Sequence, residues 1–117
     1  TQTGYQPIGS VSPLHLGIYR AASRVRKVMK LEEMVSHDRA FRDSATIQMA
    51  YAQSWALTYF LIRTRRGEFL TYLETQGAKQ SLSADKPELR LRDFEEAFGG
   101  TIRELQREFQ RYMQRVK

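Results

Sequence analysis

The chain has no cysteine among its 117 residues. A disulfide-stapled fold and a thiolate metal site are therefore both excluded, whereas the compartment stays undecided. The only histidines, His15 and His37, stand far apart in the sequence, and there is no HExxH motif. Because a zinc site needs several convergent ligands, we expect no metal and no cofactor in this chain. Surface or helix-capping roles are expected for both histidines.

Long hydrophobic runs and phosphate-binding loops are also missing. The apolar run at 55–62 is too short to span a bilayer, so no membrane span is expected. The two glycines of "AFGGT" follow a predicted helix and lack the P-loop lysine. The paired carboxylates Glu32–Glu33 and Glu95–Glu96 are adjacent and so point to different helix faces. From these residue patterns alone, no complete catalytic site can be identified.

Acidic residues are outnumbered, and the formal net charge is +6. The densest basic stretch, at 20–30, contains Arg20, Arg24, Arg26, Lys27 and Lys30. Such a stretch is most often a solvated helix face, and the alternative is a face that binds an acidic protein or nucleic acid. No aromatic residue is interleaved among these charges, so base stacking has little support and nucleic acid is not the expected partner.

What the sequence does contain is helical periodicity. Residues 1–12 predict an extended lead-in, and 13–117 predict a single α-helical domain. Ser12 followed by Pro13 is typical of a helix start and predicts a first helix over 13–29. The buried face of this helix is predicted to be Leu14, Ile18, Ala21, Val25 and Val28. The chain starts without methionine, so we expect a fragment or a processed product.

The remaining segments continue this pattern. A short helix at 31–35 precedes a central helix at 44–65, whose second half, "WALTYFLI", is apolar on nearly every side and so predicted to be buried. Gly67 is expected to break the pattern before a helix that ends at Gly77, and a polar loop follows. Pro87 opens a helix that stops at Gly99–Gly100, and Thr101 with Glu104 predicts a capping box for the last helix. The helical spacing of apolar residues in the last helix predicts a buried stripe of Ile102, Leu105, Phe109, Tyr112, Met113 and Val116. We therefore expect an all-α fold of about five helices packed around the central helix.

The order of three segments carries a resemblance. "AYAQSWALTYFL", "GEFLTYLETQGA" and "FEEAFGGTIRELQREFQRYMQRV" together resemble the C-terminal helical region of gluzincin-type zinc metallopeptidases of the MA clan. Within these, the chain looks like an uncharacterised bacterial domain family with peptidase-like features. The closing pattern is carried by Ala97-Phe98-Gly99, Leu105 and Tyr112, with Phe109 where tryptophan is common. The resemblance covers about 31–117, and 1–30 fit only as a linking helix.

This resemblance implies a role that the chain cannot perform alone. The HExxH helix and the downstream glutamate ligand of such peptidases precede this region and are missing here, so this chain alone is expected to be inactive. Zinc would belong to the parent protein, and whether that parent is an active peptidase stays open. The implied partners are the N-terminal zinc-binding part of the same protein and a peptide substrate. The chain would form one wall of the substrate cleft.

The resemblance also implies a role for Tyr51. In aminopeptidase N-like gluzincins, a tyrosine at the start of a similar helix donates a hydrogen bond to the oxyanion of the tetrahedral intermediate. Tyr51 occupies the matching place, with Gln53 and Trp55 expected to pack or to support it. The polar start of the helix would then face the cleft. The alternative for Tyr51 is a buried tyrosine that is bonded to a backbone carbonyl.

A second interpretation of the whole chain also stays open. It is a stand-alone helical interaction module whose basic face binds an acidic protein or nucleic acid. The +6 net charge motivates it.

Overall fold

The computed structural model describes residues 11–78 and 86–116, and it is all-α over this range, as predicted. The helices are α1 (Pro13–Arg24), α2 (Leu31–Ser36), α3 (Arg39–Arg42), α4 (Ile47–Thr64), α5 (Arg66–Gly77), α6 (Pro87–Phe98) and α7 (Ile102–Arg115). The described residues thus form seven helices rather than about five; the short helix predicted over 31–35 is present as α2, and α3 is a further short helix that the sequence did not predict. The predicted lead-in over 1–12 and most of the predicted polar loop lie outside the described residues.

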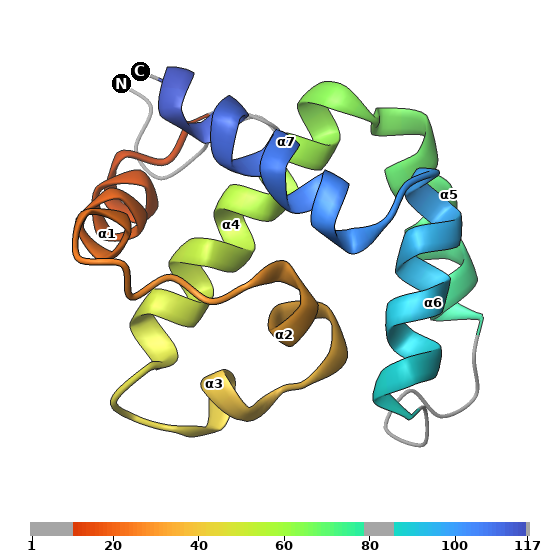
Figure 1. Ribbon diagram of the computed structural model, residues 1–117, viewed down its shortest axis with the longest axis horizontal. Coiled ribbons are helices and arrows are strands. Elements are labelled where there is room, and N and C mark those ends of the chain that lie inside the picture. Colours follow the sequence, from red (N-terminus) through yellow and green to blue (C-terminus); the bar gives the residue numbers. More distant parts are fainter. Residues whose placement is uncertain (1–10, 79–85, 117) are drawn as a thin grey trace, which may run out of the picture.

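The central helix is α4, which Figure 1 shows running through the middle of the molecule. Helices α1, α3, α5 and α7 all pack against it. Its buried side chains include Ala56, Phe60 and Leu61, so the prediction that "WALTYFLI" lies in the core is confirmed. The helix begins at Ile47 rather than at 44, because residues 44–46 form a turn closed by bonds from the Thr46 and Ile47 amides to the Asp43 carbonyl.

Helix α1 ends at Arg24, earlier than the predicted residue 29, and the reason is its C-terminal geometry. The Lys27 amide donates to the Ala22 carbonyl at 2.8 Å, and the Arg26 amide donates to the Ser23 carbonyl at 3.1 Å. These two bonds form a Schellman motif, in which one residue adopts the left-handed conformation. That residue is Arg26, with a φ of 57°. Glycine is the usual residue at this position. Because arginine stands there instead, the end of the helix could not be predicted from the sequence.

The predicted buried face of α1 is only partly right, because Ile18 and Val28 are partly buried against the core but Leu14, Ala21 and Val25 are exposed. Leu14 and Val25 are 69% and 63% exposed, whereas Leu16 and Tyr19 are buried. The helix therefore packs on α4 through the neighbouring stripe, in which Tyr19 meets Phe109 of α7 edge to face at 5.7 Å between ring centroids. Burying the large side chains of Leu16 and Tyr19 removes apolar surface from water and so favours this orientation of the helix.

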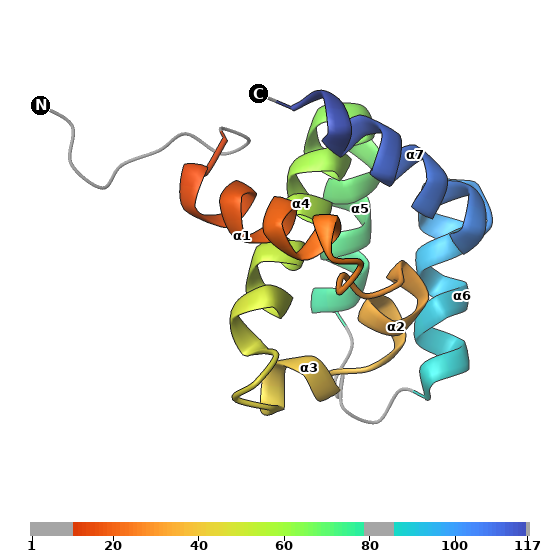
Figure 2. The same ribbon diagram turned by 60° about the vertical axis from the view of Figure 1, so that its left-hand side comes forward.

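Helices α5 and α6 lie side by side, in both Figure 1 and Figure 2. The Tyr72 ring of α5 contacts the rings of Phe94 and Phe98 of α6, with centroids 5.6 and 5.4 Å apart. The prediction that Gly67 breaks the helical pattern is wrong. The break falls at Arg65, and Gly67 lies inside the first turn of α5. Gly99 ends α6 in the left-handed conformation with a φ of 71°, as the "GG" pair predicted.

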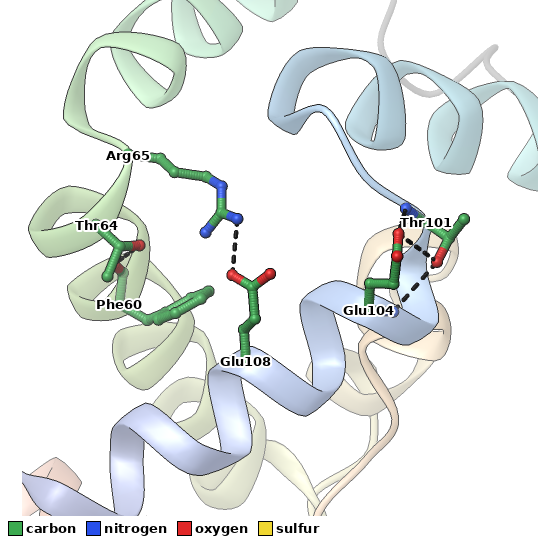
Figure 3. A network of polar contacts seen from close by, with 6 residues as sticks. All are labelled: Phe60, Thr64, Arg65, Thr101, Glu104 and Glu108. Atoms are coloured by element: carbon green, nitrogen blue, oxygen red, sulfur yellow. Dashed lines mark hydrogen bonds and ion pairs between the residues drawn. The ribbon is translucent and has the colours of Figure 1, made fainter.

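The start of α7 confirms the predicted capping box, which Figure 3 shows. The Thr101 hydroxyl accepts from the Glu104 amide at 3.2 Å, and the Glu104 carboxylate accepts from the Thr101 amide at 3.0 Å. The Thr101 hydroxyl also donates to the Glu104 carboxylate, and the bonds that the Thr101 amide and hydroxyl donate lower the pKa of the Glu104 carboxyl. The Glu95 carboxylate also accepts from the Ile102 amide at 2.7 Å, so α6 and α7 are fixed at their corner.

Figure 3 also shows how α7 is tied to the end of α4. The Arg65 guanidinium, at the break between α4 and α5, donates to the Glu108 carboxylate at 2.7 Å. The predicted buried stripe of α7 is confirmed, since all of its residues are buried except Tyr112, which is partly buried against the core.

Candidate functional site

Tyr51 lies in the second turn of α4 and is 56% exposed. Its ring contacts Phe41 of α3 edge to face, with centroids 5.3 Å apart and an interplanar angle of 72°. The alternative of a buried tyrosine bonded to a backbone carbonyl is therefore wrong. The structure holds the ring from one side and leaves the phenol facing solvent.

Gln53 lies on the opposite side of the same helix and is only 1% exposed. Its Oε1 accepts from the Met29 amide at 2.8 Å, and its Nε2 donates to the Met29 carbonyl. The side chain therefore satisfies both backbone groups of one residue in the connection between α1 and α2. The expectation that the polar start of the helix as a whole faces a cleft is wrong for Gln53, which faces the interior.

A second glutamine holds the same connection from α7. Gln106 Oε1 accepts from the Leu31 amide at 2.8 Å. Buried backbone groups need partners, and the connection has no helix or sheet of its own to supply them. The two glutamines, from α4 and α7, perform this task. The sequence shows a glutamine next to buried residues on each of these helices. The partners of the two glutamines could not be predicted, because they lie far away in the chain.

The other residues near Tyr51 have packing roles. Trp55 is half-buried and stacks between the rings of His15 and Tyr59, at 6.2 and 5.3 Å between centroids. The packing role expected for Trp55 is confirmed. His15 also lies within 3.0 Å of the Ser12 hydroxyl at the start of α1, so the expected capping role fits it.

Within 11–78 and 86–116, no group of three His, Asp or Glu side chains could hold a metal ion. In the part of the chain that the structure describes, no helix is long and apolar enough to cross a membrane.

Four surface pockets lie elsewhere, and Tyr51 lines none of these four. One lies between α1 and α7 and includes Arg20 and Arg24. Another includes Lys30 with Arg103 and Arg107 of α7. The basic stretch at 20–30 is therefore divided, because α1 ends at Arg24 and the connection turns away.

Comparison with protein families supplies a family. A family model described as "Protein of unknown function (DUF1570)" matches residues 2–83, which is more than half of the chain. The chain belongs to the DUF1570 family. The match includes α1 to α5 of this DUF1570 chain, and so Phe41 and Tyr51, and it ends before α6. Searches of curated proteins and of solved structures found no match.

Proposed function

We propose that this DUF1570 chain is the C-terminal helical subdomain of a gluzincin-like zinc metallopeptidase. It forms one wall of the substrate cleft and is inactive alone. In this proposal, the zinc ligands belong to the rest of the parent protein. The membership in a family described only as of unknown function is compatible with this proposal.

The observation that carries the proposal is the placement of Tyr51. Its phenol is exposed, and its ring is held against Phe41, so the hydroxyl can meet a substrate without first leaving a partner. A positioned donor of this kind stabilises the oxyanion that forms when water attacks a peptide carbonyl. Helix α4 buries Ala52, Ala56 and Phe60 in the core, and this packing positions the donor.

Replacing Tyr51 with phenylalanine in the parent protein tests this role. We expect turnover of a peptide substrate to fall about 100-fold, because one oxyanion donor contributes on the order of 3 kcal/mol to the barrier. The free energy of unfolding should change by less than about 0.5 kcal/mol, since the hydroxyl is on the surface. Unchanged turnover in a folded variant would remove the assignment.

A second candidate function is favoured by the outer face of α7. Arg103, Arg107, Arg111 and Arg115 recur at every fourth position, and all four are exposed. Like charges at this spacing repel one another and destabilise the helix slightly. Such a row is favourable when an anionic partner covers it. We propose, as the alternative, that this row binds an acidic protein segment.

The arginine row can be tested with polyglutamate as the probe. We expect binding at low salt that weakens steeply as sodium chloride is added. Arg107→Gln with Arg111→Gln should weaken it at least about fivefold. Arg42→Gln with Arg66→Gln removes the same charge from exposed positions on α3 and α5 and should change it less than about twofold. Equal losses, or binding of an oligonucleotide but not of polyglutamate, would contradict an acidic protein partner.

A further inference from the structure

The recess between α1 and the C-terminal half of α7 has a volume of about 470 Å³ and an unusual lining. Arg20 and Arg24 line it from α1, and Gln110 and Gln114 line it from α7. Each pair is four residues apart, so both members lie on the same side of their helix. No carboxylate belongs to the lining. Two guanidinium groups and two carboxamides therefore border one cavity without an acidic side chain between them.

The arginines are available to a ligand. Among the described residues, neither Arg20 nor Arg24 has an ion-pair partner. Each guanidinium carries several N–H donors in a planar fork, which fits the oxygens of a carboxylate or a phosphate. The carboxamides of Gln110 and Gln114 add further N–H donors on the opposite wall.

Tyr19 supplies the most informative observation. It is only 5% exposed, its ring packs on Phe109, and it lines the recess. The structure gives its hydroxyl no hydrogen-bond partner within 11–78 and 86–116. Fully enclosed side-chain polar atoms in the described residues all have partners, so this hydroxyl opens into the recess. The Tyr19 phenol is therefore held in place by its buried ring, while its hydroxyl is free to donate a hydrogen bond to a ligand in the recess.

The protonation state of Tyr19 is compatible with that role. Burial raises the pKa of the Tyr19 phenol above its ordinary value. The hydroxyl therefore stays protonated at neutral pH, where it can donate a hydrogen bond to an anion. Met113 on α7 adds an apolar surface to the same recess.

We propose that this recess is a binding site for a small oxyanion, namely a carboxylate or phosphate group carried by a small molecule. Arg20 and Arg24 neutralise its charge, and the Tyr19 hydroxyl and the two carboxamides orient its oxygens. The inference goes beyond the peptidase role and does not rest on it, because the recess includes neither Tyr51 nor any residue of α4.

The test uses the whole chain at constant ionic strength, which keeps general screening the same throughout. Inorganic phosphate is titrated in one arm and malonate in the other, and the side-chain amide signals of Gln110 and Gln114 are followed by NMR. We expect saturable shifts in at least one arm. Saturation by phosphate alone assigns a phosphate group, and saturation by malonate alone assigns a carboxylate.

Two sets of variants separate a site from general surface charge. Arg20→Gln with Arg24→Gln should weaken binding at least about tenfold. Arg42→Gln with Arg66→Gln removes the same charge from exposed positions on α3 and α5, outside both the recess and the α7 arginine row, and should change binding less than about twofold. Tyr19→Phe should weaken binding at least about threefold and shift the melting temperature by less than about 3 °C, because the lost hydroxyl bonds no protein group.

Three results would overturn the proposal. The first is shifts that rise linearly in both arms without saturation. The second is an equal loss in the two double-arginine variants, which would indicate only the net charge of the surface. The third is full binding by a folded Tyr19→Phe variant together with full binding by the Arg20 and Arg24 variant.

Discussion

Replacing Phe109 with alanine is expected to lower the free energy of unfolding by about 3–5 kcal/mol. Phe109 is only 2% exposed, and its ring meets Tyr19 of α1 and Phe60 of α4 edge to face, each at 5.7 Å between centroids. One side chain of α7 thus joins three helices. Truncation leaves a cavity that rigid helices close only in part.

Chemical denaturation followed by circular dichroism measures this loss. Because a domain of this size is stable by only about 5–15 kcal/mol, the midpoint should fall strongly. Leu70→Ala is the control, since Leu70 is 52% exposed on α5 and its truncation should cost less than about 1 kcal/mol. A loss below about 1 kcal/mol for Phe109→Ala would mean that Phe109 is not a central core residue.

Replacing Gln53 with leucine should cost about 2–4 kcal/mol, although leucine is apolar and similar in size. The substitution removes both bonds to Met29 and leaves its amide and carbonyl without a partner on α4. Leaving a buried polar group without a hydrogen bond costs more folding free energy than a formed hydrogen bond contributes. The loss should therefore exceed any gain from the added apolar surface.

The matched control is Gln48→Leu, an exposed glutamine on the same helix, which should change stability by less than about 0.5 kcal/mol. Amide hydrogen exchange adds a local readout. The Met29 amide should exchange faster in the Gln53 variant, because its acceptor is gone. A Gln53→Leu variant as stable as the wild type, with Met29 still protected, would contradict the role of Gln53 in holding the connection.

The sequence predicted the parts of this fold that are encoded locally. Three helix ends each depend on residues only a few positions apart. They are the start of α1 at Ser12–Pro13, the stop of α6 at Gly99 and the capping box of Thr101 and Glu104. The inner stripe of α7 was equally readable, because its polar and apolar faces differ sharply. Such signals are set by local geometry, which tertiary packing did not override here.

The predictions failed where two helix faces could equally be buried, or where a residue bonds a partner that is distant in the sequence. Helix α1 carries two apolar stripes, and only packing on α4 selects the one with Leu16 and Tyr19. The left-handed Arg26 replaces the expected glycine signal. The bond from the Met29 amide to Gln53 joins the connection after α1 to α4 and has no sequence signature.

The two candidate sites differ in how far they could be predicted from the sequence. Tyr51 was singled out through the resemblance, and the structure adds its exposure and its contact with Phe41. The recess was not predicted, since its walls come from opposite ends of the chain. The sequence shows Arg20 and Arg24 only as part of a basic stretch, and nothing in it places Gln110 and Gln114 opposite them.

The measurement that tests the proposed function most directly is the sequence of the reading frame immediately upstream of Thr1. The proposal predicts a helix with an HExxH motif, followed by a second helix that carries a glutamate ligand. With these ligands in place, Tyr51 is the next residue to mutate. A short upstream segment without such ligands would contradict the peptidase role, and it would leave the anionic-partner role of the α7 arginine row as the leading function.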